Sequence, residues 1–190
     1  MARKGITPNM LTAAGFFFAI INFVCLALSL YGLALFFIIL NRLMDGLDGA
    51  VARQKTDTSD NHKTQETDLG GFLDIVSDFI FYAGSVFFFA VGQSQHALAA
   101  AFLLFCFMGT ASSFLAYAII ASKRGINHSR QGKKSFFYLS GITEGSETVL
   151  LLILICLLPS YFAYLSVTFG ILCLLTTVGR IGQAIRDFKM

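Results

Sequence analysis

Two pairs of aspartates lie within long apolar stretches of this 190-residue chain: Asp45 with Asp48, and Asp74 with Asp78. A carboxylate at the centre of a membrane-spanning helix costs about 3 kcal/mol and by default marks a functional site. Four acids that face one another would also repel strongly unless divalent cations lay between them. Because no His or Cys stands beside them, the oxygen ligands favour Mg²⁺, Mn²⁺ or Ca²⁺ over zinc. The pattern therefore predicts a metal site.

The residues around the first pair indicate what the metal would serve. Mg²⁺ usually completes its coordination shell with water and substrate phosphates, so a carboxylate cage predicts a phosphate or diphosphate substrate. Gly49 and Ala52 follow on the same helix face and leave room for a flat or bulky group. Arg53 adds a side chain that can donate two hydrogen bonds to one phosphate.

Membrane-spanning helices are the elements that must position these acids. Hydrophobic residues make up 56% of the chain and charged residues 13%, with a mean hydropathy of +0.72. A soluble domain of this length would carry roughly a quarter charged residues. Apolar runs near twenty residues predict an all-α integral membrane protein, a six-transmembrane helix bundle in one domain over residues 1–190. The expected helices cover residues 9–30, 31–53, 70–91, 96–121, 141–158 and 161–184.

The distribution of Lys and Arg predicts the orientation in the membrane. The turns expected near Tyr31–Gly32, residues 92–95 and Pro159–Ser160 contain neither residue, whereas basic residues gather in both terminal segments and in the two remaining connections. The positive-inside rule then places both termini in the cytosol.

The two aspartate pairs are expected at the same depth. Asp45 lies eight residues before Arg53, and Asp78 lies eight residues after Gly70. At 1.5 Å per residue, both acids are at most about 12 Å along the helix axis from the cytosolic membrane edge. Facing each other, the two helices would form a polar pocket that opens to the cytosol.

The acidic segments resemble the signature of the CDP-alcohol phosphatidyltransferases. The stretch from Pro8 to Thr12 looks like the Pro-Asn-x-x-Thr segment that opens the first helix of many members, and residues 134–148 look like small bacterial members whose acceptor is unassigned. The similarity covers nearly the whole chain. The matching letters are Asp45-x-x-Asp48-Gly49-x-x-Ala52-Arg53 and Gly70-x-x-x-Asp74-x-x-x-Asp78.

What the resemblance implies can be assigned to numbered residues. Asp45, Asp48 and Asp74 would bind one or two Mg²⁺ or Mn²⁺ ions on the diphosphate of a CDP-linked lipid. Asp78 would take the proton from the acceptor alcohol and would also contact a metal. The nucleotide would be bound by Gly49, Ala52, Arg53, Gly70, Asn9 and Thr12.

The implied activity is transfer of a phosphatidyl group from CDP-diacylglycerol to a small polar alcohol, with release of CMP, in phospholipid biosynthesis. Such an enzyme would lie in the bacterial inner membrane with its active site on the cytosolic side, and no nucleic acid would take part. The reverse polarity remains open, in which a CDP-alcohol such as CDP-choline donates to diacylglycerol. An alternative of another class is a divalent-cation transporter that uses the intramembrane carboxylates.

Four features of the sequence have two readings. The basic residues between 123 and 134, including Lys133 and Lys134, either bind a phosphate on the acceptor or face anionic lipid heads. Glu144 and Glu147 either bind the acceptor or complement a helix dipole. Small residues in the last two helices allow close helix contacts or a homodimer seam. The aspartates themselves could form a polar helix contact, with Asp45 paired to a neighbouring arginine. The small residues are Gly145, Gly170 and Gly179, and the arginines are Arg42 and Arg53.

One part of the chain departs from the family pattern. The spacer between Arg53 and Gly70 has sixteen residues, Gln54 to Leu69, and is longer than the family usually has. Doubling a flexible loop costs only about 0.6 kcal/mol of closure entropy, so the pocket can tolerate it. This cytosolic insertion, residues 54–69, bears on access or regulation more than on catalysis.

Overall fold

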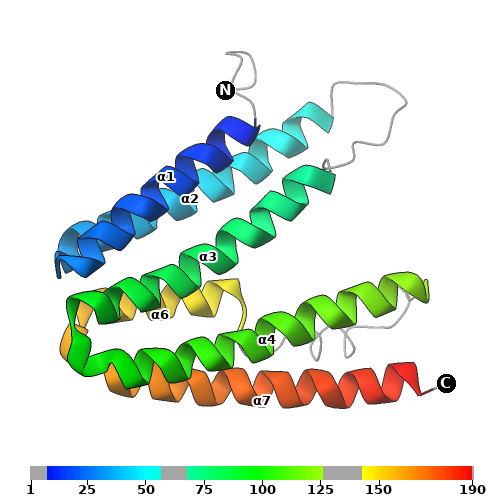
Figure 1. The fold of residues 1–190 in the computed structure, drawn as a ribbon. Helices are drawn as coiled ribbons and strands as arrows, with labels where there is room; N and C mark the ends of the chain where they lie inside the picture. The colour runs from blue at the N-terminus through cyan, green and yellow to red at the C-terminus, as the bar shows by residue number, and fades with distance from the viewer. Residues whose placement is uncertain (1–7, 57–67, 126–142, 190) are drawn as a thin grey trace. The chain divides into compact units, whose positions relative to one another are not determined.

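The computed structural model describes residues 8–56, 68–125 and 143–189, and within these ranges the chain is helical and has no strand (Figure 1). Contacts divide the chain into two compact units, Met1–Gln93 and Ser94–Met190. The first unit contains α1 (Pro8–Ala27), α2 (Tyr31–Thr56) and α3 (Asp68–Gly92). The second contains α4 (Ala97–Lys123), α6 (Gly145–Leu157), α7 (Phe162–Phe188) and two short 3-10 turns, η2 (Ser94–His96) and η4 (Pro159–Tyr161).

The six expected helices are present, each with ends a few residues from the predicted ones. Within the part of the chain whose side chains are described, three helical segments are long and apolar enough to cross a membrane, and two shorter segments are also apolar. α2 is in neither group, and its residues after Gly46 lie outside this comparison. These helices agree with a membrane protein. The arrangement of six spans around one cytosolic pocket stays a prediction. The long segments are Gly70–Gly92, Ser94–Lys123 and Pro159–Phe188, and the shorter ones are Ala14–Ala27 and Gly145–Leu157.

The first connection lies earlier than the sequence indicated. The prediction began the second helix at Tyr31, which is where α2 begins. It ran the first helix to Leu30 and placed the turn at Tyr31–Gly32, whereas the break falls at residues 28–30. There Ser29 has a φ of 56°. Its N–H donates to the carbonyl of Leu26, while the N–H of Leu30 donates to the carbonyl of Cys25. This is a Schellman ending, in which a left-handed residue closes the helix; glycine is the usual residue there, so the serine hid the turn.

In the first unit α1 packs against both α2 and α3. The centre is mostly apolar, with Leu26, Ile38, Phe81 and Phe89 almost wholly removed from solvent. It also buries one polar pair, in which Nδ2 of Asn22 in α1 donates to the hydroxyl of Ser85 in α3 at 2.9 Å. A Cβ at Gly84 of α3 would lie only 2.4 Å from the ring of Phe23 in α1. A side chain at this position would therefore have to push the ring of Phe23 aside, and the glycine lets the two helices approach closely.

In the second unit α7 packs against α4 and α6. A glycine again allows two helices to approach closely, since a Cβ at Gly170 of α7 would lie 2.6 Å from the ring of Phe102 in α4. Gly170 thus serves contact within the unit. A homodimer seam at the small residues stays a prediction.

The outer faces of the helices are strongly apolar. Phe17, Phe36, Phe105 and Met108 are each more than half exposed, and many other large apolar side chains are exposed alongside them. A soluble protein rarely exposes contiguous apolar surface on this scale, because water penalises it. Lipid tails accept it, so the outer faces agree with a membrane environment.

Candidate active site

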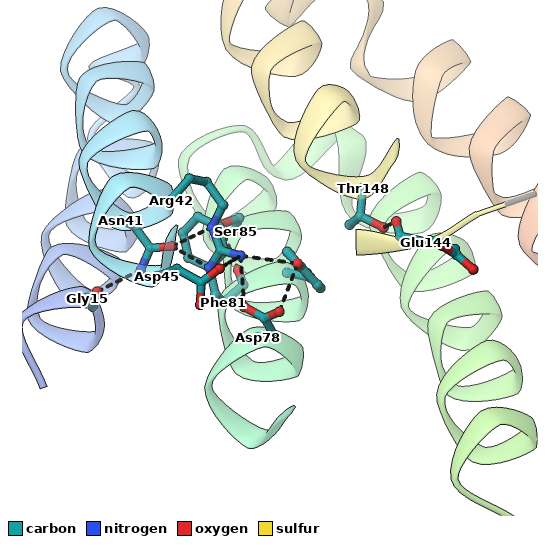
Figure 2. A network of polar contacts seen from close by, with 10 residues as sticks. Gly15, Asn41, Arg42, Asp45, Asp78, Phe81, Ser85, Glu144 and Thr148 are labelled. Carbon is teal, nitrogen blue, oxygen red and sulfur yellow. Dashed lines mark hydrogen bonds and ion pairs between the residues drawn. The ribbon is translucent and has the colours of Figure 1, made fainter. Parts of the chain in front are cut away.

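Within the first unit, Asp45 of α2 and Asp78 of α3 meet at one guanidinium group (Figure 2). Nη1 of Arg42 lies 2.9 Å from Oδ1 of Asp78 and 3.4 Å from Oδ2 of Asp45. Arg42 is placed one helical turn before Asp45, so it reaches along its own helix and across to α3 at once. The structure thus brings together one acid from each half of the motif.

Asn41 holds the rest of the guanidinium. Its Oδ1 accepts hydrogen bonds from Nε and Nη2 of Arg42, at 2.9 Å and 2.6 Å. Its Nδ2 donates to the carbonyl oxygen of Gly15 in α1, at 2.7 Å. Asn41 is 5% exposed, and a buried amide with partners at both ends has a fixed orientation. α1 therefore positions Arg42 through Asn41 (Figure 2).

Two aromatic rings of α3 support the guanidinium on another side. Its central carbon lies 4.8 Å from the ring centre of Phe81 and 5.6 Å from that of Tyr82. The hydroxyl of Tyr82 accepts a hydrogen bond from Nη1 of Arg42 at 3.3 Å and donates to Oδ2 of Asp78 at 3.2 Å. Both oxygens of Asp78 are consequently engaged, Oδ1 by the cation and Oδ2 by the phenol.

The site is partly open. The exposed fraction of the side chain is 20% for Arg42, 28% for Asp78 and 41% for Asp45. A small ion can therefore reach both carboxylates without passing through the packed core. The two acids fit a cation, because both already approach a single positively charged atom, Nη1 of Arg42.

A complete set of metal ligands is not assembled by the described side chains. Among residues 14–46, 70–125 and 143–189, no three His, Cys, Asp or Glu side chains form a group that could hold a metal ion. Asp74 lies on α3 one turn before Asp78 and is exposed. Asp48 is in α2, but its side chain lies outside the described residues.

The expected nucleotide-binding residues are placed only by their backbone. Gly70 lies in the first turn of α3 and is half-buried. Asn9 and Thr12 are in the first turns of α1, and Gly49, Ala52 and Arg53 are in the last turns of α2; their side chains lie outside the described residues, as do Lys133, Lys134 and most of the insertion.

Glu144 and Glu147 form a capping box at the start of α6. The Glu144 side chain accepts a bond from the backbone N–H of Glu147, whose Oε2 in turn accepts the N–H of Glu144 at 3.0 Å. Thr148 adds a hydroxyl bond of 2.8 Å to the carbonyl of Glu144. These contacts show that the two glutamates cap α6, while binding of the acceptor by either one stays a prediction.

Sequence reasoning assigned no functional role to Arg42, Asn41 or Tyr82. Arg42 entered only as the partner of Asp45 in the alternative of a polar helix contact, and that ion pair is present and extends to Asp78. A lone arginine inside an apolar helix is itself a signal of function. Arg180 of α7 carries the same signal: it is 6% exposed, donates to the carbonyl of Thr110 at 2.9 Å and lies over the ring of Phe114.

Comparison with known proteins gives a consistent result. A model of the CDP-alcohol phosphatidyltransferase family matches residues 5–179. The chain is also similar to the inner membrane protein YnjF of Escherichia coli (strain K12), with 48% identity over 188 residues that cover 98% of this chain and 87% of the relative. No solved structure matches the chain.

Proposed function

The chain belongs to the CDP-alcohol phosphatidyltransferase family and is a transferase, and we propose that it moves a phosphatidyl group from CDP-diacylglycerol to a small polar alcohol. The family supports phosphatidyl transfer in phospholipid synthesis. The observation that carries the proposal is the convergence of Asp45 and Asp78, from the two halves of the motif, on one cationic atom. This convergence supports a site that accepts a cation, and a divalent cation held there would balance the negative charge of a diphosphate.

The reaction needs little from the protein beyond a base and positioning. The acceptor oxygen attacks the lipid-side phosphorus, the phosphorus–oxygen bond to CMP breaks, and the alcohol proton moves to a carboxylate. We assign that proton transfer to Asp78. Tyr82 orients the carboxylate through its 3.2 Å bond to Oδ2, and Oδ1 faces the cationic side of the site.

Family members generally depend on divalent metal ions. We propose that Asp45, Asp48, Asp74 and Asp78 hold one or two Mg²⁺ or Mn²⁺ ions. When bound, such ions offset the charge that grows on phosphoryl oxygens. We further assign the cytidine side to Gly49, Ala52 and Gly70, with Arg53, Asn9 and Thr12 toward the phosphates.

The protein is proposed to lie in an inner membrane, as the E. coli relative's name states for that protein, with both termini and the active site in the cytosol. Its long apolar helices support this location. Membership of a transferase family removes the basis of the cation-transporter alternative. The reverse polarity, with a soluble CDP-alcohol as donor, uses the same motif and is separated only by experiment.

The test is release of CMP by purified protein. With Mg²⁺ or Mn²⁺, the protein should release CMP from CDP-diacylglycerol when given the correct alcohol from a panel of serine, inositol, inositol phosphate and glycerol phosphate. Asp78→Asn should abolish release while the thermal midpoint is retained. Asp187→Asn in α7, which also loses a hydrogen-bonded carboxylate, should remain active. Full activity of Asp78→Asn would refute its role as the base.

A second measurement decides the donor. CDP-diacylglycerol should raise the thermal midpoint of the protein in detergent, whereas CDP-choline should not. Protection by CDP-choline alone, with CMP release only when diacylglycerol is present, would establish the reverse polarity instead.

A further inference from the structure

Arg42 occupies the position between the two carboxylates that the proposed function gives to a divalent cation. Its Nη1 contacts Asp45 and Asp78, at 3.4 Å and 2.9 Å. A guanidinium and a metal ion cannot both occupy this point, since the ion would need to approach carboxylate oxygens to about 2.0–2.1 Å. Arg42 therefore either loses the carboxylates when the ion binds or prevents the ion from binding.

The bonds of Arg42 show which of these is favoured. Strong arginine–carboxylate pairs use two parallel hydrogen bonds. Here only Nη1 faces the acids, and it is shared between two carboxylates and the hydroxyl of Tyr82. The ion pairs are thus single-point contacts in a partly exposed site, where water weakens them further.

The remaining contacts of Arg42 do not depend on the acids. Nε and Nη2 are held by Asn41, which is fixed to the carbonyl of Gly15, and the central carbon of the group lies over the ring of Phe81 (Figure 2). Losing the carboxylates would leave these contacts in place. Because the guanidinium is a rigid plane, Nη1 stays in place with them, and it is the carboxylates of Asp45 and Asp78 that turn away from Nη1 toward an incoming ion.

We propose that Arg42 is a displaceable counter-ion of the acidic site, which neutralises Asp45 and Asp78 until a divalent cation takes over both carboxylates. This inference rests on the proposed function, because it assumes that the acids bind a cation. A divalent ion binds the carboxylates more strongly than the guanidinium does, because it carries twice the charge and approaches the oxygens more closely than Nη1 does. Arg42 then lowers the affinity of the site for the metal ion, because the ion must compete with it for the carboxylates. Oδ1 of Asp78 loses its contact with Arg42 only when the ion binds.

The test measures metal affinity without any turnover. Mn²⁺ is titrated into purified protein in detergent, and the free ion is followed by its electron paramagnetic resonance signal. Arg42→Gln should bind Mn²⁺ about tenfold more tightly than the wild type, because a competing positive charge has been removed. Arg42→Lys keeps the charge but loses both bonds to Asn41, so the positive charge is held less firmly beside the acids and competes less well with the ion. This variant should bind Mn²⁺ about threefold more tightly than the wild type.

The matched control is Arg186→Gln in α7. Arg186 also donates to a side-chain amide oxygen, that of Gln183 at 2.8 Å, but it belongs to the second unit. Its loss removes the same charge and should leave Mn²⁺ affinity unchanged.

The measured Mn²⁺ affinities decide whether Arg42 competes with the ion. Equal or weaker Mn²⁺ binding by Arg42→Gln would overturn the inference, since it would mean that Arg42 supports the bound ion or only the fold. If Arg42→Gln does not fold, the direction of the change in Arg42→Lys decides in the same way. A wild type that binds no Mn²⁺ would instead refute the metal-dependent function, and the role of Arg42 with it.

Discussion

A single arginine organises the polar centre of the first unit. Arg42 contacts acids on two helices, an amide that reaches a third, and two rings. The spacing of the aspartates was enough to expect that the two motif halves face each other, because residues three and four apart share a helix face. Sequence did not indicate Asn41 or Tyr82 as partners, since contacts across helices depend on the rotation of each helix about its axis.

Tyr82→Phe should lower kcat for CMP release about fivefold. The substitution removes the hydroxyl that orients Asp78, and one such hydrogen bond is worth about 1 kcal/mol. Steady-state kinetics with saturating donor measures the change. Tyr164→Phe, at an exposed tyrosine of α7, is the control and should have no effect. An unchanged kcat with a lowered thermal midpoint would mean that Tyr82 serves packing alone.

At the scale of the elements, helix lengths followed from the length of the apolar runs, whereas helix ends did not. Backbone N–H and C=O groups in lipid must be satisfied within the helix, so a long apolar run is sufficient to predict one. An end is set by a few local bonds, as at Ser29, where no glycine or proline marks the turn.

Ser29→Gly should stabilise the first unit. The residue adopts a φ of 56°, a conformation that carries a steric cost for serine and almost none for glycine. We expect a gain of up to about 1 kcal/mol in the free energy of unfolding, because the greater freedom of glycine in the unfolded chain offsets part of the benefit. Thermal unfolding in detergent measures it. Ser160→Gly, in a turn without positive φ, should give no gain, and an equal gain there would contradict the explanation.

Glu147→Ala should lower the free energy of unfolding by about 1 kcal/mol, since it removes one half of the capping box of α6. Glu147→Gln should be nearly neutral, because its amide oxygen can accept the same hydrogen bond. Both variants should keep the KM for the acceptor alcohol. A raised KM in Glu147→Gln with unchanged stability would instead support the prediction that this carboxylate binds the acceptor.

At the scale of the whole molecule, the basic residues predict that both ends of the chain lie in the cytosol. A fluorescent protein fused to either end should therefore fluoresce in cells, and alkaline phosphatase fused to either end should be inactive. Opposite results at the two ends would require an odd number of spans, which would contradict the six-span arrangement.

The sequence alone was sufficient for the family and the helices, because hydrophobic length and fixed polar spacing are local properties of a chain. Tertiary structure decided what lies between the acids. Whether Asp45 and Asp78 meet each other, a metal ion or an arginine depends on how α2 and α3 are rotated and on a carbonyl of α1 that fixes Asn41. Residue spacing along one helix cannot specify such a contact, since it arises only when three helices pack together.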